Sequence, residues 1–469
     1  MAENVREIVL DALLAIEREQ EYSNRLIGAV LDKYDYLEGR DKAFIKRVTE
    51  GTLERQLELD YYLGLFSSVP VRKMRPPIRC LLRMSLYQLL YMDSVPDSAA
   101  CNEACKLASK RGFGSLKGFV NGVLRKLSRE KGALPLPDRD KEPAKYFSVK
   151  YSMPEWIVKL WMEEYGGEIT ETILGGLLRV HPVHLRLRTD ISDDDRAAIC
   201  RKLQEADISL EQSRYLPYLY AVQTGESPAA LPGFSEGRFT VQDVSSALAV
   251  EAADIHPGDF VIDVCAAPGG KSLLAAEKTE RVLSRDISSE KTDRIREYAE
   301  RMGAESLQIQ IHDARVFDET LRESADVVLL DVPCSGLGVI GKKRDIKYRI
   351  SPEGMENLAA LQREIVKVCS EYVKPGGILL YSTCTINVHE NEEMVQFISE
   401  ELPFEPQPLD QVLPKTLMQY KERIERLRRE CGKELSLKSD EGRRQACIQM
   451  LPGFMEGDGF FIARFRRKF

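Results

Sequence analysis

Two cysteines stand in separate loops, each directly after a short apolar run typical of a β-strand. Cys334 lies in the segment 331–336 (DVPCSG), and Cys384 lies in the segment 382–384 (STC). A single cysteine in a chain of this kind is usually a small buried hydrophobe. Two thiols after neighbouring strands, one of them preceded by Asp331 and a proline, favour a reactive pair over two core residues. The residue types alone leave open which thiol is the nucleophile.

A thiol pair of this kind suits methylation at carbon 5 of a cytosine, which is a poor nucleophile. A thiolate that adds to carbon 6 makes carbon 5 resemble an enamine, which can attack a sulfonium methyl group. A base must then remove the proton from carbon 5 so that the thiol can leave. Asp331 is placed to contact N3 of the cytosine as a hydrogen-bonded or proton-sharing carboxylate. The target base must be flipped out or single-stranded to reach such a site.

A loop of small residues follows the apolar run at 260–264 and precedes a predicted helix. The residues of this loop are Cys265, Ala266, Ala267, Pro268, Gly269, Gly270 and Lys271. Small side chains at such a position let the backbone approach a bound cofactor. Cys265 stands where a Walker A loop needs glycine, and the GxGxxG fingerprint of dinucleotide folds is absent. With these two alternatives disfavoured, the remaining interpretation of the loop is a binding site for a methyl donor.

Two aspartates, Asp286 and Asp313, end the next two predicted strands. By analogy with the acidic residue of dinucleotide folds, Asp286 is placed to hold ribose hydroxyls, and Asp313 to approach the adenine side of a cofactor. Alternatively, each carboxylate only caps the helix or turn that follows, which is the commoner role of a lone aspartate at a strand end. Several strands of one sheet end in acids at the same edge. This arrangement favours cofactor binding over capping as the role of these aspartates.

The elements that must position these loops begin near residue 241. Predicted strands lie at 260–264, 281–285, 307–311, 327–330, 378–381 and 460–465. Helical segments separate most of them, which predicts an α/β domain over 241–469 with a doubly wound, mostly parallel, Rossmann-like sheet. Ligands bind such sheets at the carboxyl ends of the strands, so the cofactor loop and the cysteine loops are expected to meet there. A charged stretch at 405–450, with a predicted helix at 421–430, interrupts this rhythm as an insertion of open role.

Two smaller domains are predicted before the sheet. Residues 1–135 show helix after helix, including a nearly all-apolar one at 78–91 that begins at Pro76 and Pro77. Residues 145–240 mix helices with short strands, which predicts a small α+β module. The length of 469 residues agrees with about three domains.

Basic residues cluster in two places. In the first cluster, 106–131, Glu130 is the only acid among eight lysines and arginines. This cluster is either a solvated amphipathic surface or a face that contacts phosphates. The second cluster follows the Cys334 loop, a position that favours phosphate contacts. Its members are Lys342, Lys343, Arg344, Lys347 and Arg349.

Composition argues against several other classes of protein. The formal net charge of -7 is unlike that of a general polyanion binder. The ten cysteines are scattered without a disulfide pattern, and the absence of CxxC and HExxH motifs predicts no metal site. No apolar run reaches the roughly 18 residues of a membrane helix, so no membrane partner is expected. Glu3 and Glu7 stand where a signal peptide has basic residues, which predicts a cytoplasmic protein.

Three motifs together carry a resemblance to a known family. They lie at 263–271 (DVCAAPGGK), 331–336 and 382–384. They resemble the motifs of the bacterial Sun/Fmu family of RNA cytosine-C5 methyltransferases, and the segments 242–243, 339–340 and 345–347 resemble the branch that acts on 16S ribosomal RNA. Residues 1–135 look like NusB, a helical antitermination factor with an RNA-binding fold. The segment 145–240 looks like the RRM-like subdomain found before this catalytic domain.

This resemblance implies methylation of 16S rRNA at carbon 5 of the cytosine at position 967, with S-adenosylmethionine as the methyl donor. Cys384 resembles the family's nucleophile, which bonds to carbon 6, and Cys334 resembles the cysteine that assists release of the methylated base. The residues that resemble the cofactor contacts are 265–271, Asp286, Asp313 and Asp331. The expected partner is 16S rRNA or a precursor of the small ribosomal subunit, bound by a monomer.

Some features depart from the family pattern or fit other functions. Val332 and Leu337 differ from the family's usual residues around the Cys334 loop, although no catalytic residue type changes. One alternative function is an RNA-binding regulator whose cofactor domain is silent. Both cysteines, Asp331 and an unbroken cofactor loop argue against that alternative. Another is methylation of a different RNA or of DNA.

Overall fold

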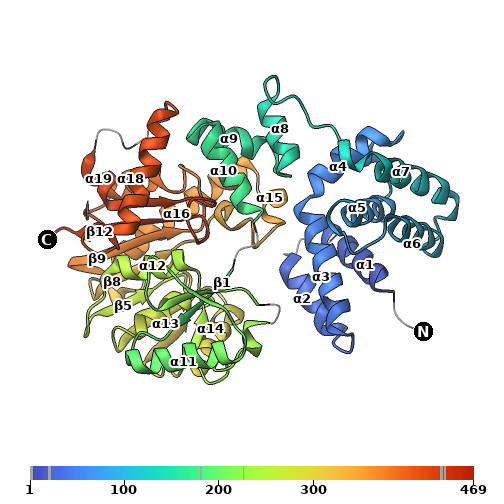
Figure 1. Ribbon diagram of the computed structural model, residues 1–469. Helices are drawn as coiled ribbons and strands as arrows, with labels where there is room; N and C mark the ends of the chain where they lie inside the picture. Colours follow the sequence, from blue (N-terminus) through green and yellow to red (C-terminus); the bar gives the residue numbers. More distant parts are fainter. Residues whose placement is uncertain (1–3, 19–22, 180–181, 225–226, 434–436, 438–439) are drawn as a thin grey trace. The chain divides into compact units, whose positions relative to one another are not determined.

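The chain forms two compact units (Figure 1). The computed structural model describes residues 4–18, 23–179, 182–224, 227–433, 437 and 440–469. Glu3, one of the two amino-terminal acids, lies outside these residues. The helical unit comprises Met1–Glu163 and Ile340–Arg349, and the sheet unit comprises Glu164–Val339 and Ile350–Phe469. Within the described ranges, no helix combines the length and the apolar character that a bilayer crossing requires.

The helical unit is built around one buried helix, α5 (Pro76–Tyr91), of which 11 residues out of 16 are buried. Pro76 and Pro77 occupy its first turn, where a missing N–H is tolerated, as the sequence predicts. The other helices in this part of the chain are α1 (Val5–Arg18), α2 (Ser23–Lys33), α3 (Gly39–Glu54), α4 (Gln56–Phe66), α6 (Asp97–Lys110), α7 (Lys117–Glu130), α8 (Pro143–Lys150) and α9 (Glu155–Tyr165). Helices α1, α3, α4, α6 and α7 pack around α5, which explains why its apolar residues are not confined to one face.

The segment Ile340–Arg349, which follows the first cysteine loop in the sequence, belongs to the helical unit and contains the short helix α15 (Ile346–Arg349). Lys347 is only 2% exposed. Its Nζ donates hydrogen bonds to the carbonyl oxygens of Glu54 at 2.7 Å and Ser152 at 2.6 Å. The prediction of a phosphate contact for this lysine is therefore wrong, because its donors are used inside the protein.

Other polar side chains of this segment are also held within the helical unit. Asp345 accepts hydrogen bonds from the backbone N and the Oγ of Ser23 at 3.0 and 2.8 Å. Arg344 forms ion pairs with Glu50 at 3.1 Å and with Glu54 at 3.0 Å. Arg349 pairs with Asp345 at 2.8 Å. These contacts give the segment a structural role that its basic composition did not indicate.

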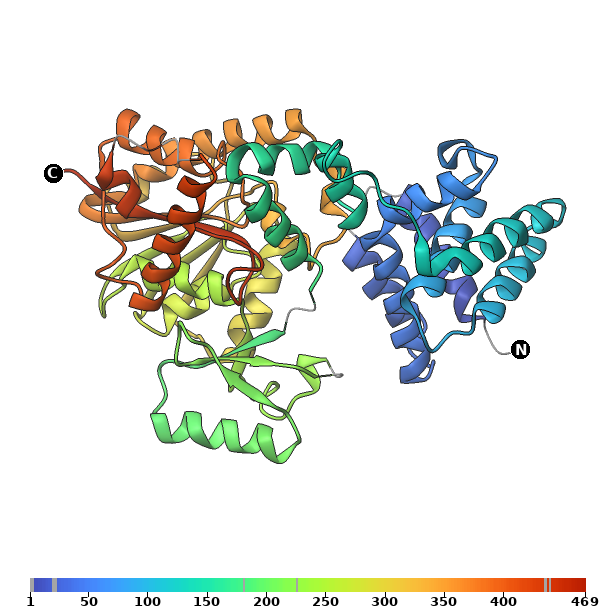
Figure 2. The same cartoon turned by 45° about the horizontal axis from the view of Figure 1, so that its top comes forward.

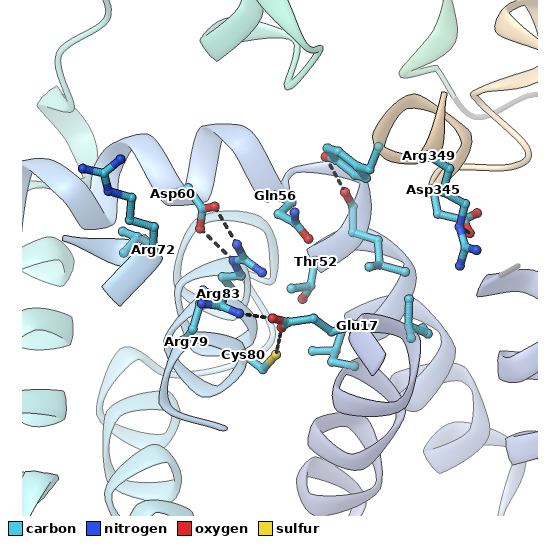
Figure 3. Close-up of a pocket in the computed structure, with 15 residues that line it drawn as sticks. Glu17, Thr52, Gln56, Asp60, Arg72, Arg79, Cys80, Arg83, Asp345 and Arg349 are labelled. Carbon is cyan, nitrogen blue, oxygen red and sulfur yellow. Dashed lines mark hydrogen bonds and ion pairs between the residues drawn. The ribbon is translucent and has the colours of Figure 1, made fainter. Parts of the chain in front are cut away.

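A cavity of about 850 Å³ lies in the helical unit beside α1, α4, α5 and the end of the 340–349 segment (Figure 3). The Arg83 guanidinium donates to both carboxylate oxygens of Asp60, at 2.7 and 2.6 Å. Arg79 pairs with Glu17, which also accepts a hydrogen bond from the Cys80 thiol at 3.2 Å. Because both arginines of α5 already have acid partners, they bring little uncompensated charge to the cavity.

Four short strands form an antiparallel sheet at the start of the sheet unit, in the order β2-β3-β1-β4. They are β1 (Val183–Leu187), β2 (Leu210–Gln212), β3 (Leu219–Val222) and β4 (Phe239–Val241). Helix α10 (Gly167–Leu177) precedes this sheet, and α11 (Asp193–Glu205) lies beside it (Figure 2). Leu203 of α11 packs into the same apolar cluster as Leu185 and Phe239. The predicted mixture of helices and short strands is confirmed.

The main sheet has the strand order β10-β12-β9-β8-β5-β6-β7, with β11 paired to β12. Its strands are β5 (Phe260–Asp263), β6 (Arg281–Asp286), β7 (Leu307–Ile311), β8 (Ala325–Asp331), β9 (Val373–Thr383), β10 (Phe404–Pro406), β11 (Cys447–Met450) and β12 (Phe460–Arg467). All pairs among β5 to β9 are parallel, and β12 joins β9 antiparallel. The doubly wound, mostly parallel fold is thus confirmed, with an antiparallel edge at β12.

The charged insertion completes that antiparallel edge. It contributes α18 (Lys415–Glu430), α19 (Glu441–Ala446) and the strand β11. Helix α18 includes the predicted segment 421–430 and buries Leu417, Tyr420 and Ile424. The remaining helices of the sheet unit that bear on the site are α12 (Val244–Ala253), α13 (Gly270–Ala276), α14 (Ser289–Met302), α16 (Pro352–Ser370) and α17 (Glu392–Glu401).

Candidate active site

The two cysteines follow the carboxyl ends of two neighbouring strands. Strands β8 and β9 are parallel, and their register places Asp331 opposite Ser382. The loops therefore leave the sheet at the same edge, and the sulfur atoms of Cys334 and Cys384 lie 3.2 Å apart. The expectation that the two thiols meet is confirmed, because strand order alone brings the ends of β8 and β9 together.

The two sulfurs differ in their surroundings. The hydrogen bond to Cys384 raises the pKa of the Cys334 thiol well above its ordinary value, and burial and the negative charges of Glu390 and Asp331 act in the same direction. Either sulfur can donate the hydrogen bond that joins the pair. The raised pKa of Cys334 favours the thiol form of that residue.

Asp331 is ion-paired with Lys271, the last residue of the cofactor loop. The Nζ of Lys271 donates to Oδ2 of Asp331 at 2.6 Å, and the Oγ of Ser382 donates to Oδ1 at 2.9 Å. Burial lowers the pKa of Lys271, but the charge of Asp331, its hydrogen bond and further negative groups that include Cys384 outweigh burial and raise that pKa. Asp331 is thus held by two hydrogen bonds, and the ammonium group of Lys271 also interacts electrostatically with Cys384.

Two more acids lie under the cofactor loop. Asp286, at the end of β6, accepts hydrogen bonds from the backbone N of Ala267 at 2.9 Å and from Lys291 at 2.9 Å. Asp263, at the end of β5, accepts one from the Oγ of Ser272 at 2.6 Å, and its Oδ1 is buried with no partner. Burial raises the pKa of Asp263 to about 7. Acids at adjacent strand ends fit the ribose hydroxyls and the cationic methionyl part of S-adenosylmethionine.

Asp313, the remaining sequence-predicted contact, stands two residues beyond the end of β7. Arg315 binds both oxygens of its carboxylate and also donates its backbone N–H at 3.0 Å. These hydrogen bonds lower the pKa of Asp313. Asp313 follows β7 and Asp286 ends β6; these neighbouring strands lie on the far side of β5 from the thiol pair.

Two features of the site were not predicted from the sequence. The first is the place of Lys271, which bonds to Asp331 and so connects the cofactor loop with the cysteine loops. The second is the pair Glu390 and Asn391, which are both fully buried. The signal for them is slight: two adjacent polar residues a few positions after Cys384. Only tertiary contacts explain why such residues are buried.

The first basic cluster lies on α6, α7 and the turns beside them. Half of its basic side chains pair with acids: Lys106 with Glu103, Lys110 with Glu7, Arg111 with Asp11, and Lys131 with Asp97. The others are exposed side chains of α7: Lys117, Arg125, Lys126 and Arg129. Acids thus neutralise half of the cluster, and a phosphate contact stays a prediction for the exposed half on α7.

A mostly parallel sheet with acids at its strand ends and a small-residue loop after β5 define an S-adenosylmethionine-dependent methyltransferase domain. The family described as "16S rRNA methyltransferase RsmB/F" matches residues 250–466, and the NusB family matches residues 3–129. The chain belongs to the RsmB/F family of 16S rRNA methyltransferases, with a NusB domain at its amino-terminal end.

Curated relatives match over nearly the whole chain. The "probable ribosomal RNA small subunit methyltransferase B" of Bacillus subtilis is 36% identical over 99% of this chain and 99% of its own length. The protein of the same description from Synechocystis is 30% identical over the same shares. The ribosomal RNA small subunit methyltransferase B of Klebsiella pneumoniae is 30% identical over 97% of this chain and 96% of its own length.

Solved structures confirm the fold. The crystal structure of PH0851 covers 100% of both chains with a TM-score of 0.77 at 23% identity. A methyltransferase homologue from Pyrococcus horikoshii covers 68% of this chain and 97% of its own, with a TM-score of 0.56 at 23% identity. At these identities the likeness concerns the architecture alone.

Proposed function

We propose that the protein methylates carbon 5 of the cytosine at position 967 of 16S rRNA through a covalent bond between Cys384 and carbon 6. The observation that carries this proposal is the thiol pair, with its sulfurs 3.2 Å apart at the ends of β8 and β9. Two adjacent thiols suit a reaction that needs both a nucleophile and a proton-transfer group. When bound, S-adenosylmethionine supplies a methyl group on a sulfonium.

The attack belongs to Cys384. Its sulfur lies 3.2 Å from that of Cys334, and it interacts electrostatically with the positive charge of Lys271. A nearby cation favours the thiolate form of a cysteine. Addition to carbon 6 places negative charge on the ring of the cytosine. Asp331, with Lys271 bound to it, lies on the same loop as Cys334 and contacts N3 of the base through a shared proton. This division of roles agrees with the one that family resemblance implies.

Release of the product belongs to Cys334. Once Cys384 is bonded to carbon 6, it no longer offers a negative acceptor, and the largest cause of the raised pKa of Cys334 disappears. Cys334 then gives up its proton, which is the proton that methylation releases overall. Its thiolate takes the proton from carbon 5, the bond from carbon 6 to Cys384 breaks, and the pair returns to its initial protonation state.

The small-subunit partner rests on the relatives, and the position 967 rests on the resemblance of short sequence segments to one branch of the family. Several of them are described as ribosomal RNA small subunit methyltransferase B. The segments 242–243, 339–340 and 345–347 resemble the same branch of the family. The amino-terminal domain matches the NusB family, whose fold binds RNA. This match agrees with structured RNA as the partner.

The test is transfer of labelled methyl from S-adenosylmethionine to naked 16S rRNA and to assembled 30S subunits, with the labelled nucleotide then mapped. Label on carbon 5 of the cytosine at 967 is the expected result. Label on another cytosine would overturn the assigned position and leave the chemistry standing. No label on any cytosine, in either substrate, would favour the alternative of an RNA-binding regulator with a silent cofactor domain.

A further inference from the structure

One turn between β9 and α17 holds both cysteine loops. It contains Glu390 and Asn391, whose side chains are 0% exposed. Burying a carboxylate and an amide costs free energy unless their hydrogen bonds are satisfied. Their partners are the neighbours of the two cysteines.

Glu390 holds the residues on both sides of Cys334. Its carboxylate accepts hydrogen bonds from the backbone N of Ser335 at 2.9 Å and from the Oγ of the same residue. It also accepts one at 2.9 Å from the Nε2 of Gln362, which donates to the carbonyl oxygen of Pro333 at 2.9 Å. The Nδ2 of Asn387 supplies a further bond at 2.9 Å. The loop is thus fixed directly before and directly after the thiol.

Asn391 holds the residues on both sides of Cys384 in the same way. Its Oδ1 accepts a hydrogen bond from the Oγ1 of Thr383 at 2.6 Å, and its Nδ2 donates to the carbonyl oxygen of Thr385 at 3.1 Å. The Nδ2 also donates to Gln449 of β11 at 2.7 Å. A hydroxyl–hydroxyl bond of 2.7 Å between Ser335 and Thr385 joins the two loops directly.

We propose that Glu390 and Asn391 are positioning residues that together set the distance between the two sulfur atoms, Glu390 through the Cys334 loop and Asn391 through the Cys384 loop. Because Glu390 and Asn391 are adjacent in the chain, the same short turn holds both cysteine loops. The turn therefore fixes the position of each thiol relative to the other. A general structural role would not require bonds to the residues that flank each cysteine. The inference that these residues affect catalysis rests on the proposed function. The inference that they set the distance between the sulfurs does not.

The two residues should therefore affect different steps. Loss of the Glu390 bonds frees the Cys334 loop, so release is the step that slows. Loss of the Asn391 bonds frees the Cys384 loop, so attack is the step that slows. A displacement of about 1 Å at a reacting group can cost on the order of 100-fold in rate. Glu390→Gln and Asn391→Ala are the variants that test this difference.

The first measurement needs neither RNA nor methyl donor. Hydrogen peroxide oxidises the two thiols to a disulfide and is itself reduced to water, with a rate that depends on the distance between the sulfurs. We expect Glu390→Gln and Asn391→Ala to form the Cys334–Cys384 disulfide more than about ten times more slowly than the unaltered protein. Glu393→Gln is the matched control, because Glu393 lies on the same segment but bonds to His389 at the surface.

The second measurement separates the catalytic steps. In RNA with 5-fluorocytosine at the target, carbon 5 carries no proton to remove, so the yield of covalent complex reports attack alone. We expect Asn391→Ala to lower that yield, and Glu390→Gln to leave it unchanged while it accumulates covalent complex on ordinary RNA. If Glu390→Gln does not fold, Ser335→Ala removes the hydroxyl bonds to Glu390 and Thr385 more gently and carries the same prediction.

The outcomes are distinguishable. Folded variants whose disulfide forms at the rate of Glu393→Gln would overturn the positioning role, whatever the catalytic result. Slower disulfide formation together with no covalent RNA complex in the unaltered protein would keep the positioning role and overturn the proposed covalent mechanism. Slower disulfide formation with both variants blocked at the same step would overturn the division of labour between Glu390 and Asn391.

Discussion

At the scale of single residues, the two thiols and the groups that bias them decide the chemistry. Sequence alone yields an unordered pair, because Cys334 and Cys384 both follow apolar runs and neither has an ionisable neighbour of known effect. The structure adds the contact between the two sulfurs, the raised pKa of Cys334 and the electrostatic interaction of Lys271 with Cys384. These differences favour Cys384 as the attacking thiol beside what family resemblance implies.

The cysteine variants give the first prediction. Cys384→Ala removes the nucleophile, so neither methyl transfer nor covalent complex is expected. Cys334→Ala leaves attack intact and removes the group that takes the proton from carbon 5, so RNA is expected to stay covalently attached. Denaturing gel electrophoresis of protein with labelled RNA separates the two cases. Free RNA and normal turnover in Cys334→Ala would remove Cys334 from the mechanism.

Lys271 gives the second prediction. Its ammonium interacts with Cys384 and is bonded to Asp331 at 2.6 Å, so Lys271→Met is expected to make the Cys384 thiolate less favourable. At pH 8 the alkylation of Cys384 by iodoacetamide should then be slower than in the unaltered protein, as mapped by mass spectrometry. Lys278→Met is the control, because Lys278 pairs with Glu251 at 3.0 Å. Equal alkylation rates in both variants would show that Lys271 does not stabilise the thiolate.

At the scale of elements, the sequence is informative where a strand is buried and continuous. The predicted runs at 260–264 and 281–285 consist largely of residues that favour strands, and each ends within one residue of β5 or β6. The place of Asp286 at a strand end was therefore predictable. Strand β11 was missed, because Cys447–Met450 is a short edge strand whose partner is a later segment. The order of the strands, and not their number, is what makes the two thiols meet.

In the segment Ile340–Arg349, by contrast, the sequence gives no sign of which side chains are buried. Its lysines and arginines look like a solvated or phosphate-binding run, since a basic composition carries no sign of burial. Lys347 is nonetheless buried, because the acceptors of its hydrogen bonds, the carbonyls of Glu54 and Ser152, are hundreds of positions away in the sequence. No local pattern could have indicated these partners.

Lys347 gives the third prediction. Burial lowers the pKa of its ammonium to about 7, the charges of Arg55 and Arg344 act in the same direction, and Glu54 and Glu58 oppose them. Between pH 7 and the ordinary pKa of lysine, the unfolded chain binds a proton that the folded chain does not. The free energy of unfolding should therefore rise with pH in this window, with a contribution of about 1.4 kcal/mol per pH unit.

Urea unfolding at pH 7, 8 and 9 measures this contribution. The two tryptophans of the chain, Trp156 and Trp161, both lie on α9 within the range of the helical unit, so their fluorescence reports that unit. In Lys347→Met the rise with pH should be smaller by the contribution of this one group. Lys343→Met, at an exposed position, should keep the rise. The same pH dependence in both variants would mean that Lys347 stays charged in the folded protein.

At the scale of the whole molecule, the chain joins a catalytic sheet to a domain of a different family. The formal net charge of -7 gives no hint of an RNA partner, and the basic residues of the NusB domain must be considered locally. The structure separates them into two sets. Lys110 and Arg111 are neutralised by Glu7 and Asp11, whereas Lys117, Arg125, Lys126 and Arg129 on α7 are exposed and form no ion pair with an acid among the described residues.

The exposed set gives the fourth prediction. Cations that contact phosphates release counterions, and each such contact contributes about 0.7 to 0.9 to the slope of log affinity against log salt. Substituting Lys117, Arg125, Lys126 and Arg129 by alanine should therefore weaken binding to 16S rRNA and reduce this slope by up to about 3. Filter binding of labelled rRNA between 50 and roughly 300 mM salt measures both quantities.

The paired set provides the control for this experiment. Lys110→Ala with Arg111→Ala removes two positive charges from the same domain, but these charges already face Glu7 and Asp11, so their loss should alter the slope by much less than one unit per residue. If the two sets of substitutions change the slope in proportion to the charge removed, the RNA responds to net charge alone. If only the exposed set changes it, α7 is the part of the NusB domain that lies against the phosphate backbone of the RNA.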